Sequence, residues 1–93
     1  MSKMEPVVFD SIWDSIYTPE EAAVMKLKVK LFEALRNHLD QLDMSQTAIA
    51  KKCKCSQSQV SDIVRGKISN FSLDRLVKTL HSLGVVVDVT IQK

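Results

Sequence analysis

The sequence lacks any long hydrophobic run, and this absence limits where the protein can work. None of its runs of apolar residues approaches the roughly 20 residues that a helix needs to cross a bilayer. The N-terminus also lacks the basic stretch followed by an apolar stretch that marks a signal peptide. We therefore expect a cytoplasmic protein of one small domain, whose limited core leaves room for support from a partner chain.

Glycine, cysteine and histidine are scarce, with two of each in 93 residues. Cys53 and Cys55 supply too few ligands for a metal, and His38 and His81 lie at no zinc-like spacing. The sequence offers no nucleophile–base pair and no glycine-rich phosphate loop. We expect neither an enzyme nor a cofactor or metal site, and we interpret both cysteines as free thiols in small apolar core positions.

The formal net charge is only +2, but the charges are unevenly distributed. Residues 1–23 carry one basic and five acidic side chains, a net charge of −4, whereas residues 24–93 carry a net charge of +6. Between residues 44 and 78 there are seven basic side chains and two acidic ones. A basic segment of this kind is typical of a surface that meets nucleic-acid phosphates.

Residues 45–67 read as two short helices joined by a tight turn. Ser45 is a good N-cap for a helix over residues 46–53, whose apolar face holds Ile49, Ala50 and Cys53. A second helix, from about residue 57 to 65, ends at Gly66 and buries an apolar stripe of Val60, Ile63 and Val64. Its opposite face is a set of amides, hydroxyls and one arginine: Gln57, Ser58, Gln59, Ser61 and Arg65. Such a face suits the major groove of DNA, where each base pair presents a distinct pattern of donors and acceptors.

This stretch resembles the helix-turn-helix of the Cro/repressor-like (XRE) regulators. Gln46 matches the start of the positioning helix, Ala50 its small crossing residue, and Arg65-Gly66-Lys67 the usual exit. The turn position that usually holds glycine is Lys54, where a left-handed backbone costs on the order of 1 kcal/mol. The resemblance implies a DNA-binding site. The residues expected to contact base edges are Gln57, Ser58, Gln59 and Ser61. The residues expected to contact the DNA backbone are Gln46, Thr47, Arg65 and Lys67, and Ser56 completes the DNA-binding set.

Residues 1–18 form an acidic N-terminal arm that is rich in aromatic side chains. Four apolar residues have partly helical spacing, namely Phe9, Ile12, Trp13 and Ile16. Two interpretations remain open: the arm folds back and caps the core, or it binds a basic partner protein through its aromatic anchors.

Two longer helices flank the motif. The first begins at Thr18-Pro19 with a capping box to Glu21 and runs to about residue 42. Its predicted core stripe is Val24, Leu27, Leu31, Leu35, Leu39 and Leu42, and Arg36 is expected on the solvated face. The second helix is capped by Ser72, stapled by Phe71 onto Leu76, and ended by Gly84. Its predicted stripe is Leu73, Leu76, Val77, Leu80 and Leu83.

Residues 85–92 have the alternating pattern of a β-strand. One face holds Val85, Val87, Val89 and Ile91. No second strand is evident, and an isolated strand leaves its backbone hydrogen bonds unsatisfied. We expect the strand to pair antiparallel with its copy in a two-fold homodimer; the alternative is a strand that lies on the helices of its own chain.

Over residues 7–92 the sequence resembles most closely the HigA-like antitoxins within this group. The resemblance implies a mainly α, repressor-like bundle: an arm (1–18), a helix-turn-helix domain (19–84) and a dimerisation strand (85–93). It also implies a dimer that binds palindromic half-sites in a double-stranded DNA operator and represses its own operon. True antitoxins further bind a small basic RNase toxin of RelE-like fold. The alternative function is a protein-interaction module that neutralises a toxin through its arm, with DNA binding secondary.

Overall fold

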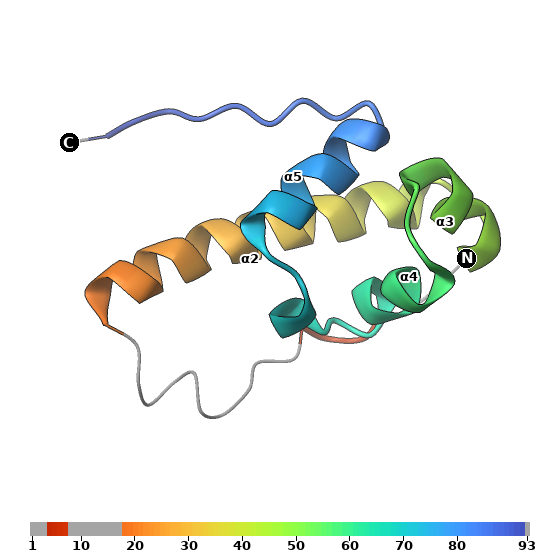
Figure 1. Cartoon of the computed structure of the whole chain (residues 1–93), viewed down its shortest axis with the longest axis horizontal. Coiled ribbons are helices and arrows are strands. Elements are labelled where there is room, and N and C mark those ends of the chain that lie inside the picture. Colours follow the sequence, from red (N-terminus) through yellow and green to blue (C-terminus); the bar gives the residue numbers. More distant parts are fainter. Residues whose placement is uncertain (1–3, 8–17, 93) are drawn as a thin grey trace.

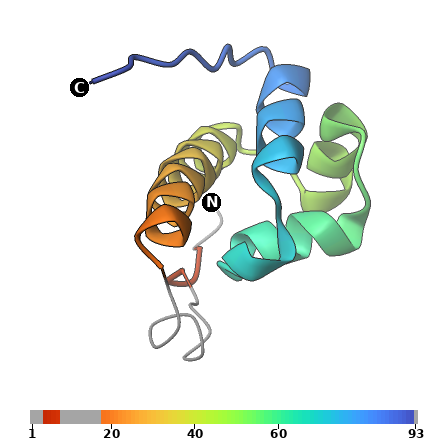
Figure 2. The same cartoon turned by 60° about the vertical axis from the view of Figure 1, so that its left-hand side comes forward.

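The computed structural model describes residues 4–7 and 18–92, which fold into a mainly helical domain (Figure 1). Its elements in chain order are α2 (Pro19–Gln41), α3 (Gln46–Cys53), α4 (Gln57–Val64), the 3₁₀ turn η1 (Ile68–Asn70) and α5 (Leu73–Ser82). The long helix α2 packs against α5, which also contacts α3, so that α5 lies between α2 and α3 (Figure 2). The four apolar residues for which partly helical spacing was noted lie outside the described residues: Phe9, Ile12, Trp13 and Ile16.

The start of α2 is the capping box predicted from sequence. The Thr18 hydroxyl accepts a hydrogen bond from the Glu21 N–H at 3.2 Å, and the Glu21 carboxylate accepts one from the Thr18 N–H at 2.9 Å. Pro19 occupies the first helical position, where its missing N–H leaves no intrahelical bond unmade. The helix ends at Gln41, with Leu42 as its C-cap.

The buried face of α2 agrees with the predicted stripe in the second half of the helix, where Leu35 and Leu39 are buried, and differs from it in the first half. Val24 and Leu27 are about half exposed, whereas Met25 and Phe32 are buried. Both sets have helical spacing, so the packing partners decide between them: Phe32 meets the ring of Phe71 at a centroid distance of 5.6 Å. The prediction for Arg36 is also wrong, because this side chain is buried rather than solvated.

The two short helices lie where the sequence places them. Ser45 caps α3 by accepting the Ala48 N–H at 3.2 Å. Lys54 has φ 57° and ψ 40°, the left-handed conformation expected at the turn position that usually holds glycine. The helix α4 ends at Val64, and Gly66 follows it at φ 75°.

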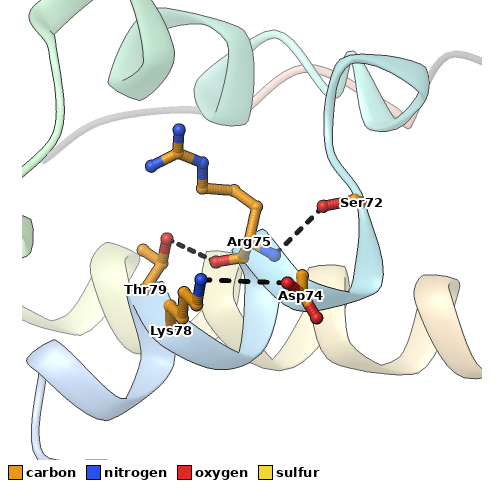
Figure 3. Close-up of polar contacts among 5 residues, drawn as sticks. All are labelled: Ser72, Asp74, Arg75, Lys78 and Thr79. Carbon is orange, nitrogen blue, oxygen red and sulfur yellow. Dashed lines mark hydrogen bonds and ion pairs between the residues drawn. The ribbon is translucent and has the colours of Figure 1, made fainter.

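The last helix, α5, is capped by Ser72, whose hydroxyl accepts the Arg75 N–H at 3.1 Å (Figure 3). Leu76 and Leu80 are fully buried, but Val77, expected in the core stripe, is 39% exposed. Thr79 is buried in its place, and its hydroxyl is satisfied by donating to the Arg75 carbonyl at 2.8 Å. Gly84, at φ 83°, follows the helix as predicted.

The core joins α2, α3, α4, η1 and α5. Its largest fully buried side chains are Phe32, Leu35, Val60, Ile63, Ile68, Leu76 and Leu80. Two of these, Val60 and Ile63, come from α4, so burial fixes the rotation of that helix about its axis.

The C-terminal segment, residues 85–92, is extended but pairs with no strand among the described residues (blue, Figure 1). Val85 and Val87 pack partly against the core, and Val86 between them is 83% exposed. Val89 and Ile91, expected on the same face as Val85 and Val87, are 65% and 79% exposed. The alternation therefore holds at the start of the segment, and pairing across a dimer stays a prediction.

Within residues 4–7 and 18–92, no helix is both long enough and apolar enough to cross a membrane.

Candidate nucleic-acid interface

The polar side chains of the predicted DNA-binding set gather at the start of α4. Gln57 and Ser58 are exposed in its first turn, whereas Val60 and Ile63 on the opposite face have no exposed surface. The helix is thus held by its apolar side and shows amide and hydroxyl groups on the other. These groups can donate to and accept from base edges.

Ser56 and Gln59 have a structural role that sequence reasoning did not separate from DNA contact. The Ser56 hydroxyl accepts the Gln59 N–H, and the Gln59 side-chain oxygen accepts the Ser56 N–H, each at 3.1 Å. This capping box uses the Gln59 oxygen within the protein, while its side-chain NH₂ group remains a donor. Ser61, one turn beyond Gln57, is half-buried.

The remaining predicted residues lie on either side of this first turn. Gln46 and Thr47 begin α3, where Gln46 is half-buried and Thr47 is exposed. Arg65 and Lys67 follow α4 and are both exposed. The start of α3 and the end of α4 therefore offer polar and basic groups suited to backbone phosphates.

The acidic side chain of α4, Asp62, is engaged within the protein. Its carboxylate accepts a hydrogen bond from the Asn70 side chain at 3.1 Å, which ties α4 to η1. Asp62 is also half-buried. Its negative charge is therefore held on the η1 side of the helix.

Two basic residues of α5 differ in their surroundings (Figure 3). Lys78 forms an exposed ion pair with Asp74 at 3.8 Å, one helical turn away, which contributes at most a few tenths of a kcal/mol. The Arg75 side chain reaches toward the helix-turn-helix. Its charge acts on Cys55, where burial raises the pKa of the thiol and Arg75 opposes that rise. Arg75 thus adds positive charge beside the turn between α3 and α4.

The cysteines lie at the turn between α3 and α4. Cys53 is buried, and this desolvation, with a smaller effect of Cys55, raises the pKa of its thiol from 9.0 to about 11. Cys55 is half-buried, and both thiols are unbridged. The prediction of core positions is confirmed for Cys53. Among the described residues no three histidine, cysteine or acidic side chains gather as a metal site would require.

Sequence reasoning missed the contacts at the end of α4. The Glu5 N–H donates to the Val64 carbonyl at 2.9 Å, and the guanidinium of Arg36 donates to the same carbonyl at 3.2 Å. Arg36 also donates to the Glu5 carbonyl. Residues 4–7 therefore fold back onto the helix-turn-helix (dark red, Figure 1), whereas the aromatic part of the arm lies outside the described residues, so both interpretations of the arm stay open.

The chain also matches a known protein family. A family model described as a helix-turn-helix domain matches residues 17–92, which is most of the chain. The chain therefore belongs to this family of helix-turn-helix domains, and such a domain suggests a DNA-binding regulator. No curated protein matches the sequence.

Proposed function

We propose that this helix-turn-helix protein is a sequence-specific DNA-binding regulator that represses its own operon. The observation that carries the proposal is the first turn of α4. There Gln57 and Ser58 are exposed on a capped helix, while Val60 and Ile63 anchor its other face in the core. A helix fixed in this way can enter the major groove with its polar side chains already oriented.

In the proposed complex, α4 is the recognition helix. A glutamine side chain matches the donor–acceptor pair of adenine, so Gln57 is assigned to an adenine, with Ser58, Gln59 and Ser61 beside it. Gln46, Thr47, Arg65 and Lys67 are assigned to the DNA backbone, where they set the register without reading sequence, and Ser56 completes the DNA-binding set. The net positive charge of residues 24–93 favours this association.

The proposed active form is a homodimer that binds palindromic half-sites. Its two recognition helices would lie ~34 Å apart, one turn of DNA. Support comes from the C-terminal segment, whose apolar side chains at Val86, Val89 and Ile91 are largely exposed in the single chain. An antiparallel pairing of this segment with its copy would satisfy its backbone groups and cover part of that surface.

Within the family, we assign the chain to the Cro/repressor-like (XRE) branch, near the HigA-like antitoxins. Lys54 supports this assignment, because it adopts the left-handed conformation at the position where that branch usually carries glycine. The Arg65-Gly66-Lys67 exit, with Gly66 at φ 75°, supports it as well.

The proposal is tested by fluorescence anisotropy on the DNA directly upstream of the gene, with scrambled DNA of the same composition as the control. Titrations at two salt concentrations separate base readout from phosphate attraction, because the phosphate component weakens as salt rises. Preference for the upstream duplex at the higher salt would support autorepression. Equal and salt-sensitive binding to both duplexes would contradict it and direct the search to operators elsewhere in the genome.

A second candidate function rests on the acidic composition of the N-terminus. Residues 1–23 carry a net charge of −4, which suits a basic partner such as a small RNase toxin. The test is co-purification of the full chain with the lysine-rich product of a neighbouring reading frame, compared with a chain that lacks residues 1–18. Capture by the full chain alone would locate the toxin-binding site in the arm, and equal capture would exclude the arm.

A further inference from the structure

Three segments distant in sequence meet at the last residue of α4. The Val64 carbonyl accepts the Glu5 N–H at 2.9 Å and an N–H of the Arg36 guanidinium at 3.2 Å. Because Arg36 also donates to the Glu5 carbonyl, one side chain of α2 joins the N-terminal segment to the end of α4. We call residues 4–7 together with Arg36 the brace.

The brace depends on a buried charge. Arg36 is 9% exposed, and desolvation lowers its pKa, while the nearby carboxylates of Glu33 and Glu5 act in the opposite direction. The guanidinium lies 5.7 Å from the centre of the Phe32 ring. It also lies at the C-terminal end of α4, where carbonyl oxygens point outward and a positive charge is favourable. Arg36 therefore needs the two carbonyls, since a buried cation without acceptors is strongly disfavoured.

The backbone of the N-terminal segment fits closely against the turn that follows α4. A Cβ atom at Gly66 would lie against the Pro6 carbonyl oxygen and 2.8 Å from the Val7 Cα. Gly66 is thus required both by its positive φ and by the space that residues 6 and 7 occupy. Met4 and Val7 add partly buried apolar contacts with the core.

We infer that the brace positions the DNA-contacting exit of the recognition helix, and that Arg36 is a positioning residue for DNA binding. Arg65 and Lys67, the proposed phosphate contacts, flank the glycine on which residues 6 and 7 lie. The hydrogen bonds from Glu5 and Arg36 hold the Val64 carbonyl before DNA binds. The residues that follow α4 therefore lose less conformational freedom on binding DNA. The inference rests on the proposed DNA binding by α4 and names the residues that support it.

The first test removes one donor of the brace. Glu5→Pro deletes the N–H that bonds to the Val64 carbonyl, whereas Glu5→Ala keeps that N–H and removes only the carboxylate. In anisotropy titrations on the duplex upstream of the gene, Glu5→Pro should weaken binding about fivefold, as expected for one lost hydrogen bond. Glu5→Ala should bind within about twofold of the wild type. Equal affinities of the two variants would overturn the inference.

The second test uses Arg36→Met, with Lys30→Met as its control because Lys30 is an exposed cation on the same helix. Arg36→Met should weaken DNA binding by about tenfold, and Lys30→Met by much less. The double variant Glu5→Pro/Arg36→Met should lose no more than the larger single effect, because both act through one carbonyl. A double variant whose loss of DNA affinity equals the product of the two single losses would overturn the inference. If circular dichroism shows Arg36→Met to be unfolded, the two Glu5 variants decide.

Amide resonances separate failure of the brace from failure of the proposed function. In the absence of DNA, Glu5→Pro and Arg36→Met should shift the N–H signals of residues 65–67, whereas Glu5→Ala and Lys30→Met should leave them in place. Shifted signals with unchanged DNA affinity would overturn the positioning role. If the wild type binds neither the upstream nor the scrambled duplex, the proposed function fails and the positioning role with it; the signals then show only whether the brace holds the exit.

Discussion

Ser56 and Gln59 each accept the other's backbone N–H at the start of α4, at 3.1 Å in both directions. Between them lie Gln57 and Ser58, which are exposed and make no such contact in the described part of the chain. The capping box therefore sets the direction of the first turn, and the two residues inside it keep exposed side chains for the proposed contact with DNA. This division of roles distinguishes two glutamines that look equivalent in sequence.

Replacing Ser56 by alanine should destabilise the fold by about 1 kcal/mol, because the first turn of α4 loses its side-chain acceptor. Urea denaturation followed by circular dichroism measures the change. Ser56→Asp is the matched control, since aspartate can accept the same N–H and should retain most of the stability. An alanine variant as stable as the wild type would show that the core alone fixes the start of α4.

Gln57→Ala should weaken binding to the preferred duplex by ~1–3 kcal/mol and relax the preference at one base pair. Its side chain is exposed, so the free energy of unfolding should not change. Anisotropy against a set of duplexes with single base-pair changes gives both quantities. Lys67→Ala is the contrasting variant: it should weaken all sequences alike and lower the salt slope by about 1. A uniform loss with Gln57→Ala would contradict base contact.

Lys54→Gly should raise the free energy of unfolding by roughly 0.5–1 kcal/mol. Lys54 has φ 57°, which is strained for a side chain with a Cβ, and glycine removes that strain at some cost in unfolded-state entropy. Lys52→Gly serves as the control, because Lys52 is exposed inside α3 and its replacement should lose up to about 1 kcal/mol. Chemical denaturation measures the free energy of unfolding of both variants. A lower free energy of unfolding for Lys54→Gly as well as for Lys52→Gly would contradict strain at Lys54.

The Cys53 thiol should make stability fall as the pH rises from 9.0 to about 11. Burial raises the pKa of this thiol to about 11, so over that interval the folded chain keeps a proton that the unfolded chain releases. Proton release by the unfolded state favours unfolding as the pH increases. Urea denaturation across this range should show a smaller decrease for Cys53→Ala than for the wild type. Parallel decreases would place the thiol in contact with water.

Val87→Pro should convert dimers to monomers, because proline removes a backbone donor from the segment that we propose to pair across the dimer. Val87→Ala is the control: it shortens the partly buried side chain but keeps the N–H. Sedimentation velocity over a range of concentrations measures the association. Dimers that persist in the proline variant would place the interface elsewhere on the domain.

Features that depend on neighbouring residues could be predicted from the sequence alone. Thr18, Ser45 and Ser72 cap the helices that follow them, and Gly66 and Gly84 lie just past helix ends. Each depends on hydrogen bonds or backbone angles within a few residues, so the residue types are sufficient evidence. The helix-turn-helix itself follows from these signals together with the apolar spacing of α3 and α4.

Features that depend on distant segments could not be predicted in this way. The face of α2 was placed on Val24 and Leu27, whereas packing with Phe71 and α5 buries Phe32 instead. Helical spacing predicts the buried Leu35 and Leu39, but the first half of α2 has apolar residues on both sides of that stripe, and only the position of its neighbours selects among them.

The sequence by itself determined the positions of the helices and the helix-turn-helix, and it placed Gln57 and Ser58 on the exposed side of α4. Only the tertiary structure decided how α4 is held: Arg36 bonds to carbonyls 28 and 31 positions away, and residues 4–7 cross the turn at Gly66. The physical reason is that caps and turns are local, whereas a buried cation takes whichever acceptors the fold brings to it.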